Sequence, residues 1–292
     1  MIGTIVGGAP ARRVRGVIDV PPHTPGFGGE GHLASFVIKP DRFSEQDPFL
    51  VLADDMLDMP PGANVGGAHP HAGFEIVTYA VSGHLDEGPE GELHEGDVQF
   101  TTAGMGVVHG EQVRTHQPTR ILQLWVALPE SQQWTVPGVS VMRRAQAQHL
   151  SASGVDVRRY RPDTGASHTI VPVTVVDIRL DPNARHALDV PAADTAFVYV
   201  LEGAVSIGGD TAVEAGQVAW FSPLGGAGDS TVLFESGAQG ARLVLYSAPP
   251  QGGTVTMHGS FVGRTPSDIS RMFRAYARGE FTRAGSIGVR EY

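Results

Sequence analysis

Apolar and polar residues alternate over short stretches of this chain, and turn residues separate the stretches at close intervals. The clearest runs are rich in Val, Ile, Phe and Tyr and lie at 74–81, 97–101, 121–126, 174–178, 197–201 and 243–246. Such runs, bounded by glycine and proline, are typical of short antiparallel strands. The pattern therefore predicts an all-β barrel or sandwich in each half, a closure that leaves few sheet edges exposed.

One segment near the end of the chain has a helical period instead. Its apolar positions at i, i+3, i+4 and i+7 are Ile269, Met272, Phe273 and Tyr276. Thr265 can cap a helix whose first position is Pro266, and Gly279 can end it. A helix near 266–278 is predicted, with its apolar stripe packed on a barrel wall.

The β pattern repeats at an offset of 120 residues: 78–83 resembles 198–203, and 96–100 resembles 216–220 without a gap. A chain of 292 residues can bury two cores of ordinary size. We therefore expect an N-terminal domain at 1–130, a linker at 131–154 where the strand pattern is lost, and a C-terminal domain at 155–292 that includes the helix.

The two copies differ in their chemistry. His69 and His71 form one pair of possible ligands, and His109 and Glu111 form another. Alternate residues of a strand face the same side, so the four side chains can converge on one point. At the 120-residue offset the second copy has Asp189, Pro191, Asp229 and Thr231. A metal site is predicted in the first copy alone.

Composition narrows the chemistry further. The chain has no cysteine, so a metal site must use nitrogen and oxygen ligands. Imidazoles with a carboxylate and vacant positions suit Fe(II), Mn, Ni, Cu or Zn. The net charge of −10 and the single lysine, Lys39, argue against a direct nucleic-acid partner.

The sequence shows no targeting segment and no motif of another enzyme class. The N-terminus does not resemble a signal peptide, and the longest apolar run, at 121–128, is far below the roughly 20 residues needed to cross a bilayer. A cytoplasmic protein without a membrane partner is expected. No Gly-x-Ser-x-Gly motif or phosphate-binding loop supports a hydrolase or nucleotidase. The remaining histidines are expected to be surface or structural residues, including His84, His94, His116, His186 and His258.

Several stretches together resemble the pirin family. They are 69–75 (HPHAGFE), 96–111 (GDVQFTTAGMGVVHGE), 47–50 (DPFL), 122–126 (LQLWV) and 258–262 (HGSFV). The resemblance implies a bicupin, two cupin β-barrels with one metal in the N-terminal barrel. It also implies that His69, His71, His109 and Glu111 are the metal ligands. Fe(II) is the expected metal, with Cu, Mn, Ni, Co or Zn as alternatives.

Three positions qualify this resemblance. The ordinary cupin pattern would use the carboxylate of the first motif, so Glu75 is an alternative ligand or an acceptor that orients an imidazole. Pirins commonly carry arginine where this chain has Ala72 and Met105. Both differences are expected to leave the mouth of the site more apolar and less suited to an anionic ligand.

The resemblance implies two main functions. Some pirin-like proteins are quercetin 2,3-dioxygenases, in which the metal binds the flavonol 3-hydroxyl oxygen, a carboxylate, here Glu111, accepts its proton, and O₂ opens the ring with release of carbon monoxide. The alternative, implied by eukaryotic pirins, is a non-enzymatic iron- or redox-sensing regulator that acts through a protein partner. Isomerisation of a small acid or sugar is supported only by the fold.

Overall fold

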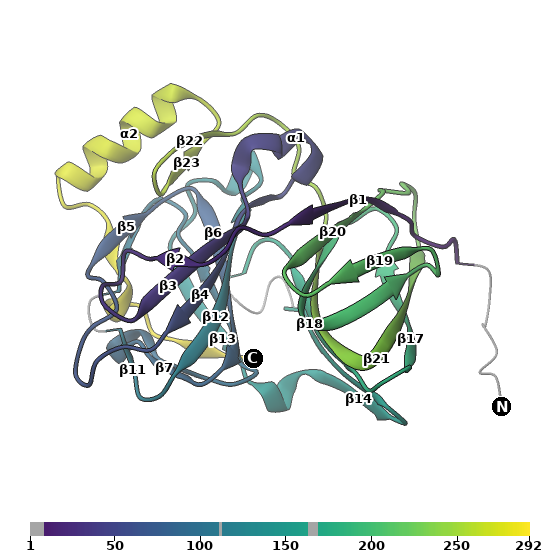
Figure 1. Ribbon diagram of the computed structural model, residues 1–292. Coiled ribbons are helices and arrows are strands. Elements are labelled where there is room, and N and C mark those ends of the chain that lie inside the picture. The colour runs from purple at the N-terminus through teal and green to yellow at the C-terminus, as the bar shows by residue number, and fades with distance from the viewer. Residues whose placement is uncertain (1–8, 111–112, 163–168) are drawn as a thin grey trace. The chain divides into compact units, whose positions relative to one another are not determined.

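The computed structural model describes residues 9–110, 113–162 and 169–292, which form two compact units (Figure 1). Unit 1 comprises the described parts of Met1–Val20, Gln148–Arg159 and Val173–Pro250. Unit 2 comprises the described parts of Pro21–Ala147, Tyr160–Pro172 and Gln251–Tyr292. Each unit has its own large sheet and its own apolar core.

Unit 2 is built on one large sheet. Over the described residues its eight strands follow the order β2 (Thr24–Pro25), β3 (His32–Ile38), β4 (Phe49–Leu57), β12 (Thr119–Ala127), β6 (Phe74–Ser82), β9 (Val98–Thr102), β13 (Gly138–Met142) and β25 (Arg290–Glu291). Neighbours are antiparallel except β13 and β25. The strands predicted at 74–81, 97–101 and 121–126 are confirmed as β6, β9 and β12.

Smaller sheets complete unit 2. They are β24 (Thr282–Arg283) with β10 (Val107–His109) and β5 (His69–His71); β11 (Arg114–Thr115) with β7 (His84–Asp86) and β8 (Glu92–His94); and the hairpin of β22 (Thr256–His258) with β23 (Phe261–Gly263). Leu85 of β7 and Leu93 of β8 are buried in one apolar cluster with Ala80 and Ile121 of the large sheet. That cluster fixes the β7–β8 hairpin on the core.

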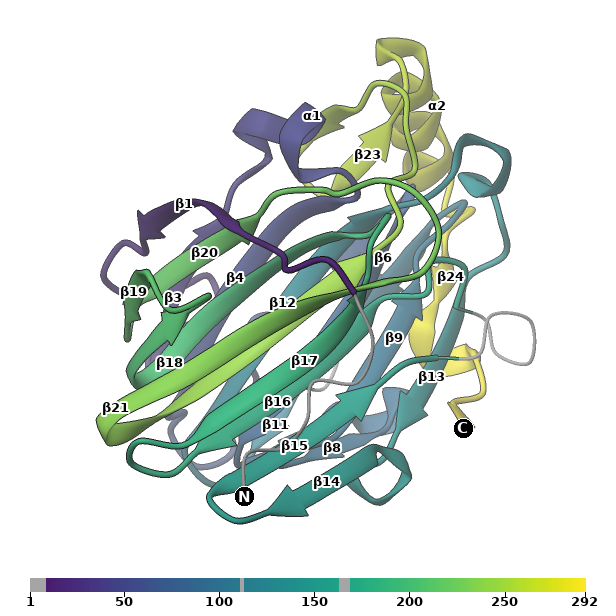
Figure 2. The same ribbon diagram turned by 90° about the vertical axis from the view of Figure 1, so that its right-hand side faces the viewer.

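The described strands of unit 1, in contrast, all belong to one sheet. Its strands within the described residues are β1 (Val14–Asp19), β20 (Gln217–Phe221), β18 (Thr195–Ile207), β21 (Asp229–Ala248), β16 (Thr174–Leu180), β15 (Val155–Tyr160) and β14 (Gln148–Ala152), with β17 (Arg185–Pro191) on β21 and β19 (Thr211–Glu214) on β18. Figure 2 shows β17, β18 and β21 running side by side. The strands predicted at 174–178, 197–201 and 243–246 are confirmed within β16, β18 and β21.

Helices contribute little to either unit. Those in the described residues are α1 (Phe43–Gln46), α2 (Pro266–Ala277) and the 3₁₀ turns η1 (Pro40–Arg42), η2 (Gly88–Glu90), η3 (Glu130–Gln132), η4 (Arg144–Gln146) and η5 (Ala284–Ser286). The predicted terminal helix is confirmed as α2. Thr265 Oγ1 accepts from the Asp268 backbone N–H at 3.2 Å, and the Asp268 carboxylate accepts from the Thr265 N–H at 2.8 Å, which is a capping box. Ile269 and Met272 are buried on its inner face.

The chain is divided differently from the predicted boundaries. Residues 251–292, with α2, lie in unit 2 and not with residues 173–250. Ala72 donates to the Ser260 carbonyl at 3.2 Å and accepts from the Val262 N–H at 2.9 Å, and β24 pairs with β10. The expected linker contains β13 of one sheet and β14 of the other. Hydrophobic patterning identifies strands but not the sheet that each strand joins, so these returns of the chain were not predicted.

Gly73 connects β5 to β6 in a conformation that favours glycine, with φ of +86°. A Cβ there would lie 1.8 Å from the Val262 carbonyl oxygen. Gly73→Ala is therefore expected to lower the free energy of unfolding by about 3 kcal/mol or more, measured by urea denaturation. Gly62→Ala is the matched control, because Gly62 has φ of +78° and a Cβ added there would meet no heavy atom within 4 Å. It should cost about 1 kcal/mol; equal losses would contradict the close approach at Gly73.

Candidate metal centre

Two short strands bring three histidines together. β5 and β10 are antiparallel, with His69 opposite His109 and His71 opposite Val107. The ring centroids of His69, His71 and His109 lie 4.4 to 4.8 Å apart. One nitrogen from each ring falls within 4.8 Å of the other two. The predicted convergence of these three side chains is therefore present.

The ring nitrogens are arranged as metal ligands require. His69 Nδ1 donates to the Gly67 carbonyl at 2.8 Å, so its Nε2 is the available ligand atom. Neither ring nitrogen of His71, nor Nε2 of His109, has a hydrogen-bond partner among the described residues, although all three are buried. Buried polar atoms are normally paired, because an unpaired one costs free energy. A bound cation would satisfy these nitrogens, so the residues fit a metal.

Burial and neighbouring groups favour the metal-binding form of His69 and His71. Burial lowers the pKa of His71 well below its ordinary value, and the neighbouring His109 and His69 lower it further. Burial also lowers the pKa of His69, again reinforced by His109. Neutral imidazole, with a free lone pair, is the metal-binding form.

Glu90 lies behind His109, and sequence reasoning did not find it. One of its carboxylate oxygens accepts from the Gly110 N–H at 2.9 Å, and the other lies 3.5 Å from His109 Nδ1. A carboxylate behind a ligating histidine orients the ring and makes it a stronger ligand. Glu90 belongs to the turn η2, where no strand periodicity indicates a direction for the side chain.

Glu75 does not lie at the histidine cluster. Its carboxylate accepts hydrogen bonds from Thr102 Oγ1 at 2.6 Å and from the backbone N–H groups of Ile170 and Val171 at 2.7 and 2.8 Å. Burial raises its pKa to about 7, against these three bonds. The expectation that it binds metal or orients an imidazole was wrong, because Gly73 breaks the strand and with it the alternation that would have placed Glu75 beside His71.

The fourth predicted ligand, Glu111, lies outside the described residues. Its assignment therefore remains a prediction from the sequence.

Unit 1 has no comparable cluster in its described part. There Asp189 is opposite Thr231, and Pro191 is opposite Asp229. In unit 2 His69 pairs with His109, and in unit 1 Asp189 pairs with Thr231. By strand pairing, the residue that corresponds to His109 is therefore Thr231, two residues after the Asp229 that the ungapped offset gives. Thr231 Oγ1 donates to Asp189 at 2.9 Å. The shift leaves the conclusion unchanged, because neither correspondence supplies an imidazole.

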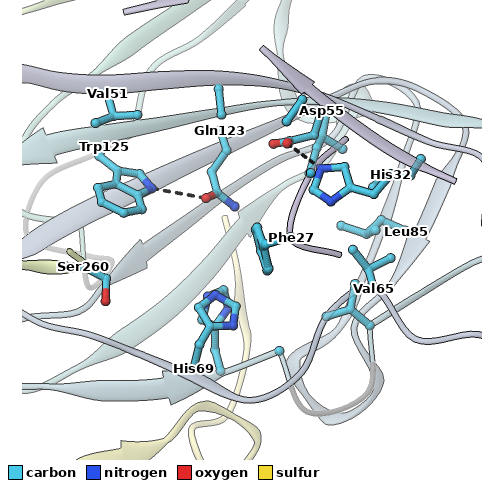
Figure 3. Close-up of a pocket in the computed structure, with 18 of the residues that line it drawn as sticks. Phe27, His32, Val51, Asp55, Val65, His69, Leu85, Gln123, Trp125 and Ser260 are labelled. Atoms are coloured by element: carbon cyan, nitrogen blue, oxygen red, sulfur yellow. Dashed lines mark hydrogen bonds and ion pairs between the residues drawn. The ribbon is translucent and has the colours of Figure 1, made fainter. Parts of the chain in front are cut away.

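The three histidines open on a cavity of about 490 Å³ in unit 2 (Figure 3). One wall of the cavity is formed by side chains of β4 and β12 that lie on the same face of the sheet. Across the β4–β12 pair, Val51 is opposite Trp125, Ala53 is opposite Gln123, and Asp55 is opposite Ile121. Alternation along each strand therefore places these side chains on the cavity side.

A few polar groups are fixed in this mostly apolar wall. His32 Nδ1 accepts from the Gly28 N–H at 2.8 Å, which leaves Nε2 as the donor to Asp55 at 2.8 Å. Trp125 donates to Gln123 Oε1 at 3.2 Å, so the Gln123 amide nitrogen remains for the cavity. Glu87 accepts from Gln99 at 2.6 Å, and burial raises its pKa to about 7.

The mouth is formed in part by a glycine-rich loop. Phe27 is 73% exposed, and its ring lies 5.5 Å from those of both His32 and His69. A Cβ on Gly26 or Gly28 would lie 2.5 Å from the His32 ring. Phe27 is thus the large side chain of this loop, and its neighbours must remain small.

The expected effect of Ala72 and Met105 on the mouth was wrong, because neither residue lines the cavity. Ala72 is fully buried in an apolar cluster with Phe261 and Met272. Met105 is 44% exposed and is not part of the cavity lining. The motif placed both residues near the metal in sequence, but the structure does not place either of them among the residues that line the cavity.

The fold and the histidine cluster agree with the matches to known families. Residues 32–126 match the model for pirin, and residues 175–282 match the model for the pirin C-terminal cupin domain. The chain belongs to the pirin family and contains two cupin domains. Among the described residues, no helix is long and apolar enough to span a membrane.

Relatives cover most of the chain. Human pirin is 32% identical over 251 residues, 82% of this chain and 84% of that protein. The crystal structure of GK1651 from Geobacillus kaustophilus has a TM-score of 0.73 and 32% identity, covering 85% of this chain and all of that one. A quercetin 2,3-dioxygenase from Acinetobacter baumannii has a TM-score of 0.79 and 26% identity, covering 93% and 98%.

Glu90→Gln is expected to weaken binding of a divalent metal to the histidine cluster by about ten- to a hundredfold, because the amide no longer presents a charged acceptor to His109. Isothermal titration with Fe(II) under anaerobic conditions measures the change. Glu130→Gln, an exposed position away from the cluster, is the control and should leave the affinity unaltered. An equal affinity for Glu90→Gln and wild type would show that Glu90 does not support the ligand.

Proposed function

We propose that this protein is a metal-dependent dioxygenase that opens the ring of a flavonol-type aromatic substrate. The observation that carries the proposal is a set of three imidazoles whose free nitrogens open on a largely apolar cavity of about 490 Å³. His69, His71 and His109 would hold the metal, with Glu111 as a fourth ligand and Fe(II) as the favoured ion. Three or four protein ligands leave positions for substrate.

The cavity suits a flat polyphenol. Its volume falls within the roughly 300 to 1,000 Å³ range of small-molecule sites. Val51, Ile121 and Trp125 offer apolar surface to aromatic rings. The structural similarity to a quercetin 2,3-dioxygenase over 93% of the chain supports the same class of substrate.

The chain's own groups bind and orient such a substrate. The Gln123 amide N–H groups donate to a carbonyl or hydroxyl oxygen, and Asp55, held by His32, accepts from a substrate hydroxyl. Phe27 covers the mouth and limits access of water. Glu111 takes the proton of the reacting hydroxyl. When bound, the metal supplies a Lewis acid for the deprotonated oxygen and a redox centre for reaction with O₂.

Iron-loaded protein is expected to consume quercetin and O₂ in equal amounts, observed as loss of flavonol absorbance and as oxygen uptake. His109→Ala should abolish both, because it removes a ligand from the centre of the cluster. His149→Ala is the matched control, since His149 pairs with Asp156 on the surface of unit 1. It should retain full activity.

The result against the proposal is the absence of turnover with iron, copper or manganese bound at the cluster. Tight flavonol binding without turnover would instead favour a binding protein that acts through a partner.

Gln123→Leu is expected to lower kcat/KM for quercetin about tenfold, because a substrate oxygen loses one hydrogen bond, worth about 1.4 kcal/mol. Metal content should stay at the wild-type level, since Gln123 lies on the strand β12 and not on β5 or β10. An unchanged kcat/KM would remove Gln123 from substrate recognition. Thermal unfolding of the variant checks that loss of the Trp125 partner has not disturbed the sheet.

A further inference from the structure

A second group of histidines lies on the small sheet of β7, β8 and β11. In the β7–β8 hairpin, His84 is directly opposite His94, and Asp86 is directly opposite Glu92. Alternation places these four side chains on one face. Leu85 lies on the other face and is buried in the core. The polar face is therefore carried by a hairpin with a fixed position.

The third strand adds another imidazole to the same face. Thr115 of β11 is opposite Leu85, so His116, the next residue, comes alongside His84. The His84 ring lies 4.3 Å from that of His94 and 4.9 Å from that of His116. His116 Nε2 is 3.5 Å from an Asp86 oxygen. Three imidazoles and two carboxylates thus gather on one small surface.

Distances within this group match metal ligands better than hydrogen bonds. Nε2 of His84 and Nε2 of His94 lie 3.5 and 3.6 Å from the same oxygen of Glu92. A hydrogen bond from nitrogen to oxygen is about 2.7 to 3.2 Å long. Ligands about 2.1 Å from a tetrahedral zinc ion are about 3.4 Å from one another. The two distances from the Glu92 oxygen are therefore those expected between neighbouring ligands of one ion.

His84 supplies an independent indication. Its Nε2 is buried and has no hydrogen-bond partner among the described residues, although the ring lies at the protein surface. The corresponding atoms of His84, Glu92 and His94 fall within 4.8 Å of one another, as they do in the cavity cluster. A cation between these atoms would pair the buried nitrogen and relieve the close approach of two imidazoles.

We propose that His84, Glu92 and His94 form a second binding site for a divalent transition metal of the zinc type. Imidazole and carboxylate ligands suit Zn²⁺, and water or His116 completes the coordination. The side chains of His94 and Glu92 are 59% and 54% exposed, so the site is open to solvent on this side. The site does not depend on the dioxygenase function, because it shares no ligand with the cavity cluster.

Titration of tag-free protein with Zn²⁺ by calorimetry tests the proposal. Wild type should bind two equivalents, and His109→Ala, which lacks the cavity cluster, should bind one. Combining His109→Ala with His94→Gln should remove the remaining equivalent, whereas combining it with His149→Ala should retain it. His149 is also an exposed histidine in contact with a carboxylate, so it controls for adventitious binding.

Glu92→Gln in the His109→Ala background should weaken the remaining equivalent at least tenfold. Co²⁺ gives a second readout, because its visible absorption in His109→Ala should disappear when His94→Gln is added. His94 and Glu92 are exposed, and circular dichroism verifies that each variant is folded.

The proposal is overturned if His109→Ala binds no Zn²⁺, or if its single equivalent survives His94→Gln. A wild-type protein whose only equivalent is lost with His94→Gln, and not with His109→Ala, would support this site while removing the cavity cluster as a metal centre.

Discussion

The antiparallel register of β5 and β10 is the constraint on which the site depends. Opposing His69 to His109 places three imidazoles close together, and the nitrogens of His71 and Nε2 of His109 are buried there without a hydrogen-bond partner among the described residues. Neither strand is long enough to hold this register alone, and the surrounding chain fixes it. β24 pairs with β10, and both the N–H and the carbonyl of Ala72 form hydrogen bonds with the segment 260–262. Gly73 has no side chain, so this segment can pass close to it. The C-terminal segment 251–292 thus completes a centre whose histidines lie in the first half of the chain.

Sequence patterning was sufficient for the strands, the terminal helix and the choice of the three histidines, because each depends on local periodicity or on the alternation of side chains along a strand. It failed where a feature depends on a break in the strand or on a partner distant in sequence. The prediction for Glu75 assumed that side chains alternate without interruption from His69 to Glu75, but the alternation stops at Gly73. Glu90 comes from a turn, and its partner is set by how the hairpin packs.

The second histidine group does have a signal in the sequence, although its members were expected to be separate surface or structural residues. His84-x-Asp86 and Glu92-x-His94 are two alternating pairs separated by one short turn, the same kind of pattern as His69-x-His71. The domain boundaries lacked such a signal, since the chain contributes to each sheet more than once. In unit 1, Asp189 and Thr231 hydrogen-bond directly where unit 2 pairs two histidines, so the same strand pairing is retained without ligands.

The glycines beside Phe27 limit how this cavity can diversify. Because the loop lies against the His32 ring, residues 26 and 28 have no room for a side chain. The His32 ring is itself held in place by hydrogen bonds with Gly28 and Asp55. Position 27 is the point in this loop at which size and polarity can change without moving the backbone. Divergence in substrate preference among chains that share this loop should therefore concentrate at that single position, while its neighbours stay constant for steric reasons alone.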